Sequence, residues 1–169
     1  MGFMVALRKV QVNSKHIPQI ISLAREIWLP TFAVYFSEDE LNSLFSGMYS
    51  PEHLTITLQN PKYRFYIVEN SDKKSIGYFA TEVKKDFLKL DKIYVAPDKQ
   101  GLGFGKWMYE QIANEAKEMG LCEIQLNVNR RNAPAIAFYH RLGFKILRSE
   151  DIPGPNGFIY DDYIMGVEV

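Results

Sequence analysis

The sequence is poor in cysteine, balanced in charge and free of long apolar runs, and each of these features excludes a class of protein. Cys122 is the only cysteine, so the chain cannot form an internal disulfide, which fits a reducing compartment. Lysine plus arginine and aspartate plus glutamate both number 20, so no overall charge favours nucleic acid or an anionic membrane as a partner. No segment approaches the ~20 consecutive apolar residues that cross a bilayer.

The N-terminal stretch MGFMVALRKVQVNSKH lacks the pattern of a targeting segment. Its apolar run is too short for a signal peptide, and no small-residue cleavage site follows it. Ala6 stands where a myristoylation signal needs Ser or Thr. We therefore expect a cytoplasmic protein with a single domain over residues 1–169 and with neither nucleic acid nor a membrane as a partner.

Candidate metal ligands are also sparse. His16, His53 and His140 are scattered, and with a single cysteine they give none of the spacings that zinc needs. We expect no bound metal.

The periodicity of apolar residues predicts a mixed α+β domain with a central sheet. Strands rich in aromatic and β-branched residues are expected over 4–12, 63–70, 74–83, 87–95, 122–128, 144–150 and 158–169. Helical spacing is expected over 17–29, 38–48, 103–118 and 133–142. The predicted order is therefore β-α-α-β-β-β-α-β-α-β-β.

Signals at the helix ends refine these boundaries. Ser14 is expected to cap the first helix, and Pro30 is expected to end it. Ser37 is followed three residues later by Glu40, which is the pattern of a capping box. A further turn or helix is expected after Pro51.

The stretch DKQGLGFGKW, residues 98–107, has three glycines at alternate positions between a predicted strand and a predicted helix. Free N–H groups and the positive end of the helix dipole meet at such a place, which favours an anionic ligand. The stretch is not a P-loop, because Gln100 replaces the first glycine and Trp107 replaces the Ser or Thr. It is not a dinucleotide fingerprint either, because no glycine stands at the third required position. It does fit Gln/Arg-x-x-Gly-x-Gly/Ala, through Gln100, Gly103 and Gly105.

That pattern resembles the pyrophosphate loop of the GCN5-related N-acetyltransferase (GNAT) superfamily. The upstream run LKLDKIYVAPDKQGLGFG is similar to the family's fourth strand and loop, and LNVNRRNAPAIAFYHRLGF is similar to its second motif. The residues that fit this second motif are Asn132, Ala135, Phe138, Tyr139, Gly143 and Phe144. The resemblance covers residues 87–144 and is looser in the N-terminal helices and the C-terminal strands. More weakly, the SEDEL…MYS region and the GFIYDDYIM ending resemble bacterial members that include polyamine-acetylating enzymes. The family resemblance implies a mostly antiparallel central sheet flanked by helices.

The resemblance also implies that acetyl-CoA is the cosubstrate and that a primary amine is the acceptor. Backbone groups of the loop would bind the pyrophosphate, and Ile93, Tyr94 and Val95 would pair with the pantetheine arm. Asn132 either contacts that arm or caps its own helix. The implied loop residues are Gln100, Gly101, Leu102, Gly103, Phe104, Gly105 and Lys106.

Two proton transfers are required when an amine is acetylated. Tyr139 matches the family's general acid, which would protonate the leaving thiolate. The acceptor ammonium, with a pKa of ~10.4, must lose a proton before it attacks. Family members often use a carboxylate on the third or fourth strand for this step, and Glu82 and Asp91 are the candidates.

The acceptor is expected to bind beside the first two helices. Trp28, Phe32 and Tyr35 are candidates for the wall of its pocket, and the acidic residues 38–40 and 161–162 would attract a cation. The alternative is that the aromatic residues belong to the core and that the acids complement a helix dipole. A protein or peptide N-acetyltransferase and a non-catalytic acyl-CoA-binding module remain alternative functions, with a monomer or a homodimer as the assembly.

Overall fold

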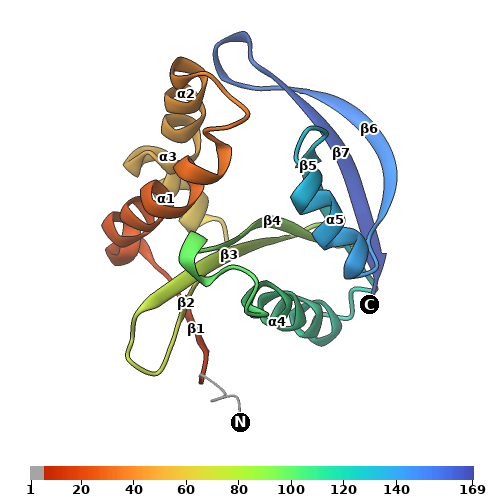
Figure 1. Ribbon diagram of the computed structural model, residues 1–169. Coiled ribbons are helices and arrows are strands. Elements are labelled where there is room, and N and C mark those ends of the chain that lie inside the picture. The colour runs from red at the N-terminus through yellow and green to blue at the C-terminus, as the bar shows by residue number, and fades with distance from the viewer. Residues whose placement is uncertain (1–5) are drawn as a thin grey trace.

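The computed structural model describes residues 6–169, and its centre is a seven-stranded sheet (Figure 1). The strands lie in the order β1-β2-β3-β4-β5-β7-β6, and every neighbouring pair is antiparallel except β4 and β5. The strands are β1 (Arg8–Gln11), β2 (Tyr63–Glu69), β3 (Ser75–Val83), β4 (Leu88–Val95), β5 (Glu123–Asn129), β6 (Lys145–Pro153) and β7 (Ile159–Glu168). The mixed α+β prediction is confirmed.

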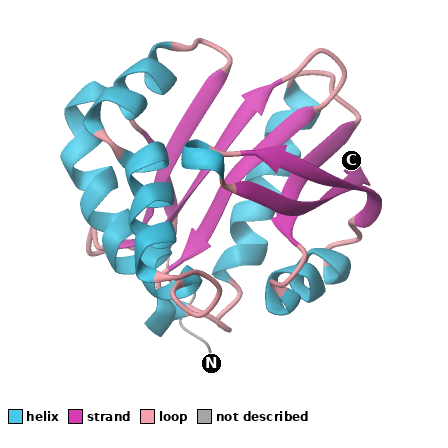
Figure 2. Ribbon diagram, turned by 90° about the horizontal axis from the view of Figure 1, so that it is seen from above, coloured by secondary structure: helices cyan, strands magenta, loops and turns pink. Residues whose placement is uncertain are grey.

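In the part of the chain that the structure describes, five α-helices cover the two faces of the sheet (Figure 2). They are α1 (Ile17–Phe32), α2 (Glu38–Tyr49), α3 (Pro51–Gln59), α4 (Phe104–Glu118) and α5 (Ala133–Arg141). Short 3₁₀ turns lie at η1 (Ser14–His16), η2 (Pro97–Lys99) and η3 (Pro155–Gly157). Among residues 6–169, no helix is long and apolar enough to span a membrane.

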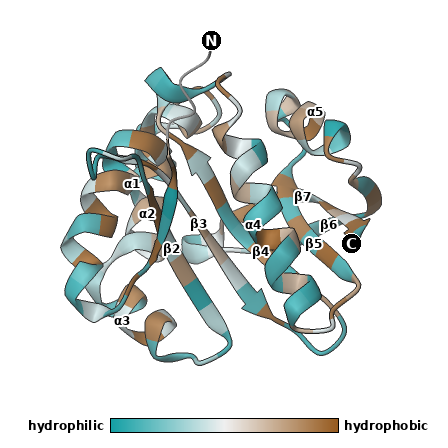
Figure 3. Cartoon of the chain, turned by 90° about the horizontal axis from the view of Figure 1, so that it is seen from below, coloured by the Kyte–Doolittle hydropathy of each residue, from teal (hydrophilic) through white to brown (hydrophobic). Residues whose placement is uncertain are grey.

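The side chains of each strand point alternately to the two faces of the sheet, and this creates two cores. On β2 and β3, Phe65 and Tyr78 pack under α1–α3, whereas their neighbours Tyr66 and Phe79 pack with the core under α4. Successive residues of a strand point to opposite faces, so each strand contributes to both layers. Hydrophobic segments, drawn in brown, accordingly lie on the sheet and on the helices that pack against it (Figure 3).

The start of the fold differs from the prediction in its details. The first strand is shorter than expected, with its described part at Arg8–Gln11, and residues 4 and 5 of the predicted range lie outside the described residues. The predicted cap, Ser14, lies inside η1, whose own capping side chain is Asn13, which accepts from the Lys15 N–H at 3.0 Å. The helix α1 has His16 at its N-cap and no capping side chain. Asn13 also donates its own N–H to the His16 ring, so it satisfies the turn better than Ser14 could.

Pro30 does not end the first helix, which continues to Phe32. Proline lacks the N–H that would donate to the Glu26 carbonyl, so the last turn of the helix forms without that hydrogen bond. Thr31 Oγ1 donates to the Ile27 carbonyl at 2.7 Å and helps to satisfy the end of the helix. The capping box of α2 is confirmed, because Ser37 N donates to Glu40 Oε2 at 2.9 Å and Glu40 N donates to Ser37 Oγ at 3.3 Å.

Candidate active site

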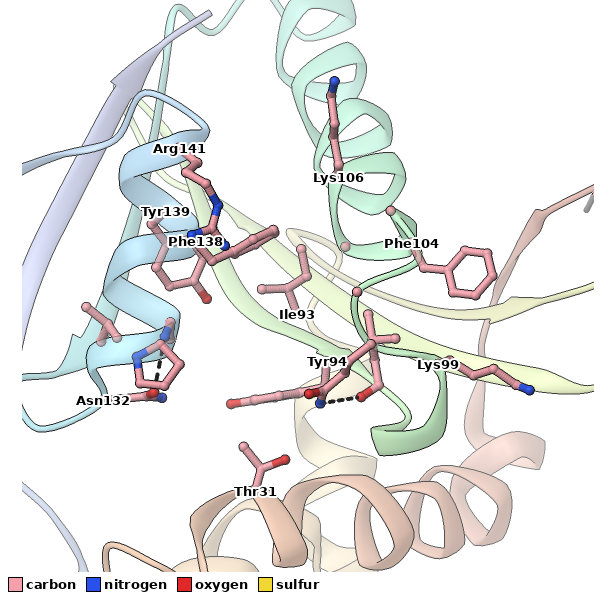
Figure 4. A pocket seen from close by; sticks show the side chains of 18 of the residues that line it. Thr31, Ile93, Tyr94, Lys99, Phe104, Lys106, Asn132, Phe138, Tyr139 and Arg141 are labelled. Atoms are coloured by element: carbon pink, nitrogen blue, oxygen red, sulfur yellow. Dashed lines mark hydrogen bonds between the residues drawn. The ribbon is translucent and has the colours of Figure 1, made fainter. Parts of the chain in front are cut away.

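Strands β4 and β5 are paired over only three residues and then separate. Their pairs are Leu88 with Ile124, Lys89 with Gln125 and Leu90 with Leu126. Beyond them, a cavity of about 530 Å³ opens between the two strands (Figure 4). Its walls come from β4, β5, α1, α5 and the loop of residues 96–103 with the start of α4, so segments far apart in the sequence meet there.

A β-bulge in β4 sets which side chains face this cavity. Ala80 pairs with Lys92 and Thr81 pairs with Leu90, so Asp91 is an extra residue on β4. The insertion reverses the alternation of the strand: Ile93 joins Leu90 in the core under α4, whereas Tyr94 packs with the core under α1–α3.

The backbone of β4 faces the cavity at alternate residues. Ala96 donates its N–H to the Ile76 carbonyl of the neighbouring strand β3 at 2.8 Å. Since backbone groups alternate in direction along an antiparallel strand, the polar groups of Ile93 and Val95 point to the other side, into the gap left by β5. The Val95 carbonyl there accepts from Gln100 Nε2 at 3.2 Å. The N–H groups of Ile93 and Val95 therefore face the cavity.

The glycine loop, residues 100–106, lies at the mouth of the cavity. Gly101 and Gly103 have φ values of +77° and +85°, a conformation that side chains rarely adopt. Gly103 is also the N-cap of α4, and no side chain caps this helix. The first N–H groups of α4 are thus left available for an anion. Gly105 has another role: a Cβ there would lie 3.1 Å from the Phe138 ring, so glycine lets α4 approach α5.

Positive charge at the cavity comes from residues on two helices and a loop. Lys99 and Lys106 line its outer edge, and their ammonium groups point away from its centre (Figure 4). Lys99 Nζ also lies 3.4 Å from Asp98 Oδ2, so these two side chains form an ion pair. Arg141 lines the cavity from α5 and was missed in the sequence. Its position three residues after Phe138 places both on one helix face, and that spacing was the available signal.

Tyr139 projects from α5 into the cavity, and its hydroxyl points toward β4 (Figure 4). Its ring packs against Phe144, with centroids 5.7 Å apart, and this contact fixes its orientation. Burial raises the pKa of Tyr139 above its ordinary value, so the hydroxyl keeps its proton across the physiological range. The group is therefore a proton donor placed inside the cavity.

Asn132 is both a helix cap and part of the cavity wall. Its Oδ1 accepts from the Ala135 N–H at 3.2 Å and from the Tyr35 hydroxyl at 3.4 Å. The expected capping role is thus present, while the Nδ2 group remains free to donate elsewhere. Asn127 and Asn129 of β5 also line the cavity and were not anticipated, because only the separation of the strands uncovers them.

The two candidate carboxylates lie near each other on β3 and β4, and both raise the pKa of Tyr63. Asp91 accepts from the Tyr63 hydroxyl at 2.6 Å and pairs with Lys92 at 2.7 Å. Burial alone would raise the pKa of Asp91, but the Lys92 ammonium and the Tyr63 hydrogen bond outweigh it and lower that pKa.

Glu82 pairs with Lys84 at 2.8 Å and lies opposite Lys89 in the sheet. Lys89 directly precedes Leu90, the last residue of β4 that pairs with β5, so Glu82 lies close to the level at which the strands separate. Neither carboxylate is among the residues that line the cavity.

Of the three aromatic candidates for the acceptor pocket, two lie at the cavity and one lies in the core. Phe32 lines the cavity together with Thr31, and Tyr35 borders it through its bond to Asn132. Trp28 does not line it: its side chain is only 2% exposed and packs against Phe45 and Tyr49 in the core. The core alternative holds for this residue.

The β6–β7 hairpin arches across to α2 and encloses this side of the molecule (Figure 1). Asn156 Nδ2 at its tip donates to Ser43 Oγ of α2 at 2.9 Å. Phe158 packs edge-on against Phe36, with ring centroids 5.5 Å apart. The hairpin and α2 therefore close the space beside the cavity.

Among residues 6–169, no three His, Cys, Asp or Glu side chains gather as metal ligands.

Comparisons with known proteins agree with this geometry. The family model described as "Acetyltransferase (GNAT) family" matches residues 23–144. The chain is 26% identical over 164 residues to the spermidine N(1)-acetyltransferase of Thermoplasma acidophilum, and the matched residues cover 95% of each chain. It is 34% identical over 87 residues to the ribosomal protein bS18-alanine N-acetyltransferase of Escherichia coli, covering 51% of this chain and 57% of that protein.

Solved structures show the same fold. The crystal structure of the PaiA N-acetyltransferase from Thermoplasma acidophilum in complex with coenzyme A has a TM-score of 0.81 at 25% identity and covers 97% of this chain and 99% of that one. The ribosomal-protein-S18-alanine N-acetyltransferase of Escherichia coli has a TM-score of 0.72 at 22% identity and covers 97% and 94% of the two chains, a likeness of fold.

Proposed function

The chain belongs to the acetyltransferase (GNAT) family and is an acyltransferase, and we propose that it moves the acetyl group of acetyl-CoA to a primary amine of a small molecule or polyamine. The observation that carries this proposal is the cavity between the separated ends of β4 and β5, which joins the glycine loop to Tyr139. The crystal structure of a relative with coenzyme A and the same fold supports the choice of cosubstrate.

The described residues fit acetyl-CoA at both ends of the cavity. The uncapped N-terminus of α4 and the left-handed glycines would bind the pyrophosphate through backbone N–H groups. The free edge of β4 at Ile93 and Val95 would pair with the amides of the pantetheine arm, as a further strand would. Asn132 would add a side-chain donor, and Arg141 would add a positive charge.

The Val95 N–H is the proposed donor to the acyl oxygen. It faces the gap and is held in place, because the Val95 carbonyl is bonded by Gln100 and the next residue is paired with β3 through Ile76. A preorganised backbone donor of this kind stabilises the transition state of acyl transfer by ~2.7–4 kcal/mol.

Tyr139 is the proposed general acid. Its hydroxyl lies in the cavity, and burial raises its pKa, so the proton is present when the thiolate leaves. A tyrosine is a weaker acid than a thiol, so the transfer depends on position more than on acidity.

Asp91 is the proposed general base, acting through water, and it is preferred to Glu82. It lies at the bulge of β4, just past the last pair of β4 with β5, whereas Glu82 lies opposite Lys89, one pair before it. The lowered pKa of Asp91 keeps the carboxylate ionised, so it can accept a proton throughout the neutral pH range.

A small acceptor is preferred because the β6–β7 hairpin closes the acceptor side against α2. The second candidate is a protein or peptide N-acetyltransferase, which the local 34% identity to the bS18-alanine enzyme favours. The proposal further includes a single N-acetyltransferase domain over residues 1–169, a cytoplasmic location and a monomer or homodimer.

Thiol release from acetyl-CoA, measured with a panel of amines and a peptide, tests the proposal. Spermidine, putrescine, aminoglycosides and a peptide with a free N-terminus form the panel. Release that depends on a small amine is expected. Turnover of the peptide alone would select the second candidate, and coenzyme A binding without turnover would indicate a binding module.

A further inference from the structure

Three polar side chains form a chain across the sheet at the point where β4 and β5 part. Lys89 of β4 donates to Asn127 Oδ1 of β5, and the amide of Asn127 is hydrogen-bonded to Asp162 of β7. An ammonium group can only donate, so the Asn127 oxygen must accept from Lys89, and its NH₂ group must then donate to the carboxylate. The amide therefore separates a cation from an anion that would otherwise pair.

Asp162 differs from the acidic residues around it. Its side chain is 8% exposed, and among residues 6–169 it has no ion pair. Neighbouring carboxylates are all paired: Asp91 with Lys92, Glu150 with Arg148, and Asp161 with Arg130. A carboxylate accepts up to about four hydrogen bonds, so one amide leaves most of its capacity unused.

Asp162 does not itself line the cavity, but it lies beside two residues that do. It is directly opposite Asn129 in the pairing of β5 with β7, and Asn127 is its diagonal neighbour on the same face. Both asparagines line the cavity. Tyr160, on the same face of β7, packs with the core of α1 and α2, so this face looks toward the aromatic residues of the acceptor side.

The acetylated nitrogen itself must lie elsewhere. The proposed donor to the acyl oxygen is on β4, across the gap from β5, and β7 lies one strand further away. At least two strand spacings, roughly 10 Å, thus separate the strand of Asp162 from the reacting edge. A carboxylate at this distance suits a second charged group of the acceptor.

We propose that Asp162 binds a second ammonium group of the acceptor, so that the enzyme prefers diamines or polyamines to monoamines of the same length. This inference rests on the proposed function. Lys89 is the resident cation of the cluster and opposes the incoming ammonium. Burial raises the pKa of Asp162 and lowers that of Lys89, which agrees with two charges held apart in a poorly solvated place.

The test compares putrescine with butylamine, which has the same chain length and a single amine. With the Asp162→Asn variant, kcat/KM for putrescine is expected to fall about tenfold to a hundredfold through KM, the range for losing a hydrogen bond to a charged group. The kcat/KM for butylamine should stay within about twofold of wild type. Asp162→Glu should retain most of the preference for putrescine over butylamine. Glu150→Gln is the matched control, because Glu150 lies opposite Asp162 on β6 but is paired with Arg148.

Equal losses for both amines, or no loss, would overturn the inference while leaving the acetyltransferase reaction standing. If the wild-type protein binds coenzyme A but acetylates no amine, the proposed function fails as well. Lys89→Met provides a second test that does not depend on the folding of Asp162→Asn. Removing the opposing cation should lower KM for putrescine severalfold and leave butylamine unchanged; an unchanged or higher KM for putrescine would contradict the inference.

Discussion

Leu90 of β4 and Leu126 of β5 form the last pair of these two strands before the strands separate. The next residue of β4, Asp91, is the bulged one, so the sheet loses its regular pairing on both sides of β4 at the same level. This coincidence opens the cavity, turns Ile93 and Val95 toward it, and leaves a backbone edge with which an extended ligand can pair. The proposed reaction depends on this irregularity.

Gly103 is expected to be required for cosubstrate binding as well as for stability. Gly103→Ala should destabilise the fold by about 1 kcal/mol, because φ is positive there, and should weaken coenzyme A binding about tenfold by shifting the loop N–H groups. Gly120→Ala is the control: Gly120 also has a positive φ, at the end of α4, but does not line the cavity. Thermal unfolding and calorimetry measure the two effects, and equal loss of binding in both variants would refute the role of the loop.

Tyr139→Phe is expected to lower kcat about 10²- to 10⁴-fold, the range for a lost general acid, with coenzyme A binding unchanged within about twofold. Tyr109→Phe is the matched control, because Tyr109 packs on the same Phe144 ring, with centroids 5.7 Å apart, and lies outside the cavity. Since burial raises the pKa of Tyr139, wild-type kcat should show no alkaline decline below about pH 10. Full turnover by Tyr139→Phe at every pH would remove the proposed acid.

The two carboxylates give a prediction about the base. Asp91→Asn should lower kcat about 10²-fold or more, whereas Glu82→Gln should leave it within about twofold. The pKa of Asp91 is lowered from 3.8, so protonation of this base should reduce kcat only below about pH 4. An acid limb at higher pH in wild-type kcat/KM would then belong to the acceptor ammonium. Equal effects of the two substitutions would contradict the assignment of Asp91.

Asp162 should make the fold less stable at neutral pH than a neutral residue would. Its pKa is raised in the folded protein, so the native state binds the proton more tightly than the unfolded chain does. Stability therefore falls as the pH rises from the ordinary value of 3.8 through the raised one. Asp162→Asn should unfold at a higher temperature than wild type at pH 8, and the difference should vanish near pH 4.

Glu150→Gln is again the control, since an exposed ion pair contributes little and the melting temperature should hardly change at either pH. A lower melting temperature for Asp162→Asn at pH 8 would mean that the carboxylate stabilises the fold through Lys89.

Much of the fold follows from local patterns. The strands near Tyr63, Ser75 and Leu88 are rich in aromatic and β-branched residues, and the capping box at Ser37 fixes the start of α2. The glycine loop and the second motif predict where the cofactor cavity lies, because their chemistry is local to the chain. These elements needed no knowledge of distant partners.

The remaining features depend on contacts that a single sequence does not display. The bulge at Asp91 exists only relative to β3, and the exposure of Asn127 exists only because β4 leaves β5. Glu115 reads as the polar side of α4, yet it is 4% exposed and bonded to Arg64 and Thr81. Trp28 is buried because α2 packs over it. In each case a residue distant in the sequence but adjacent in the fold decides whether the side chain is buried or exposed, or how the strand pairs.

A crystal structure of the protein with coenzyme A tests the central claim most directly. The account predicts the pyrophosphate at the first turn of α4, the pantetheine arm between β4 and β5, and the sulfur within hydrogen-bond distance of the Tyr139 hydroxyl. An arm that binds outside the gap, or a sulfur on the far side of the molecule from Tyr139, would contradict it.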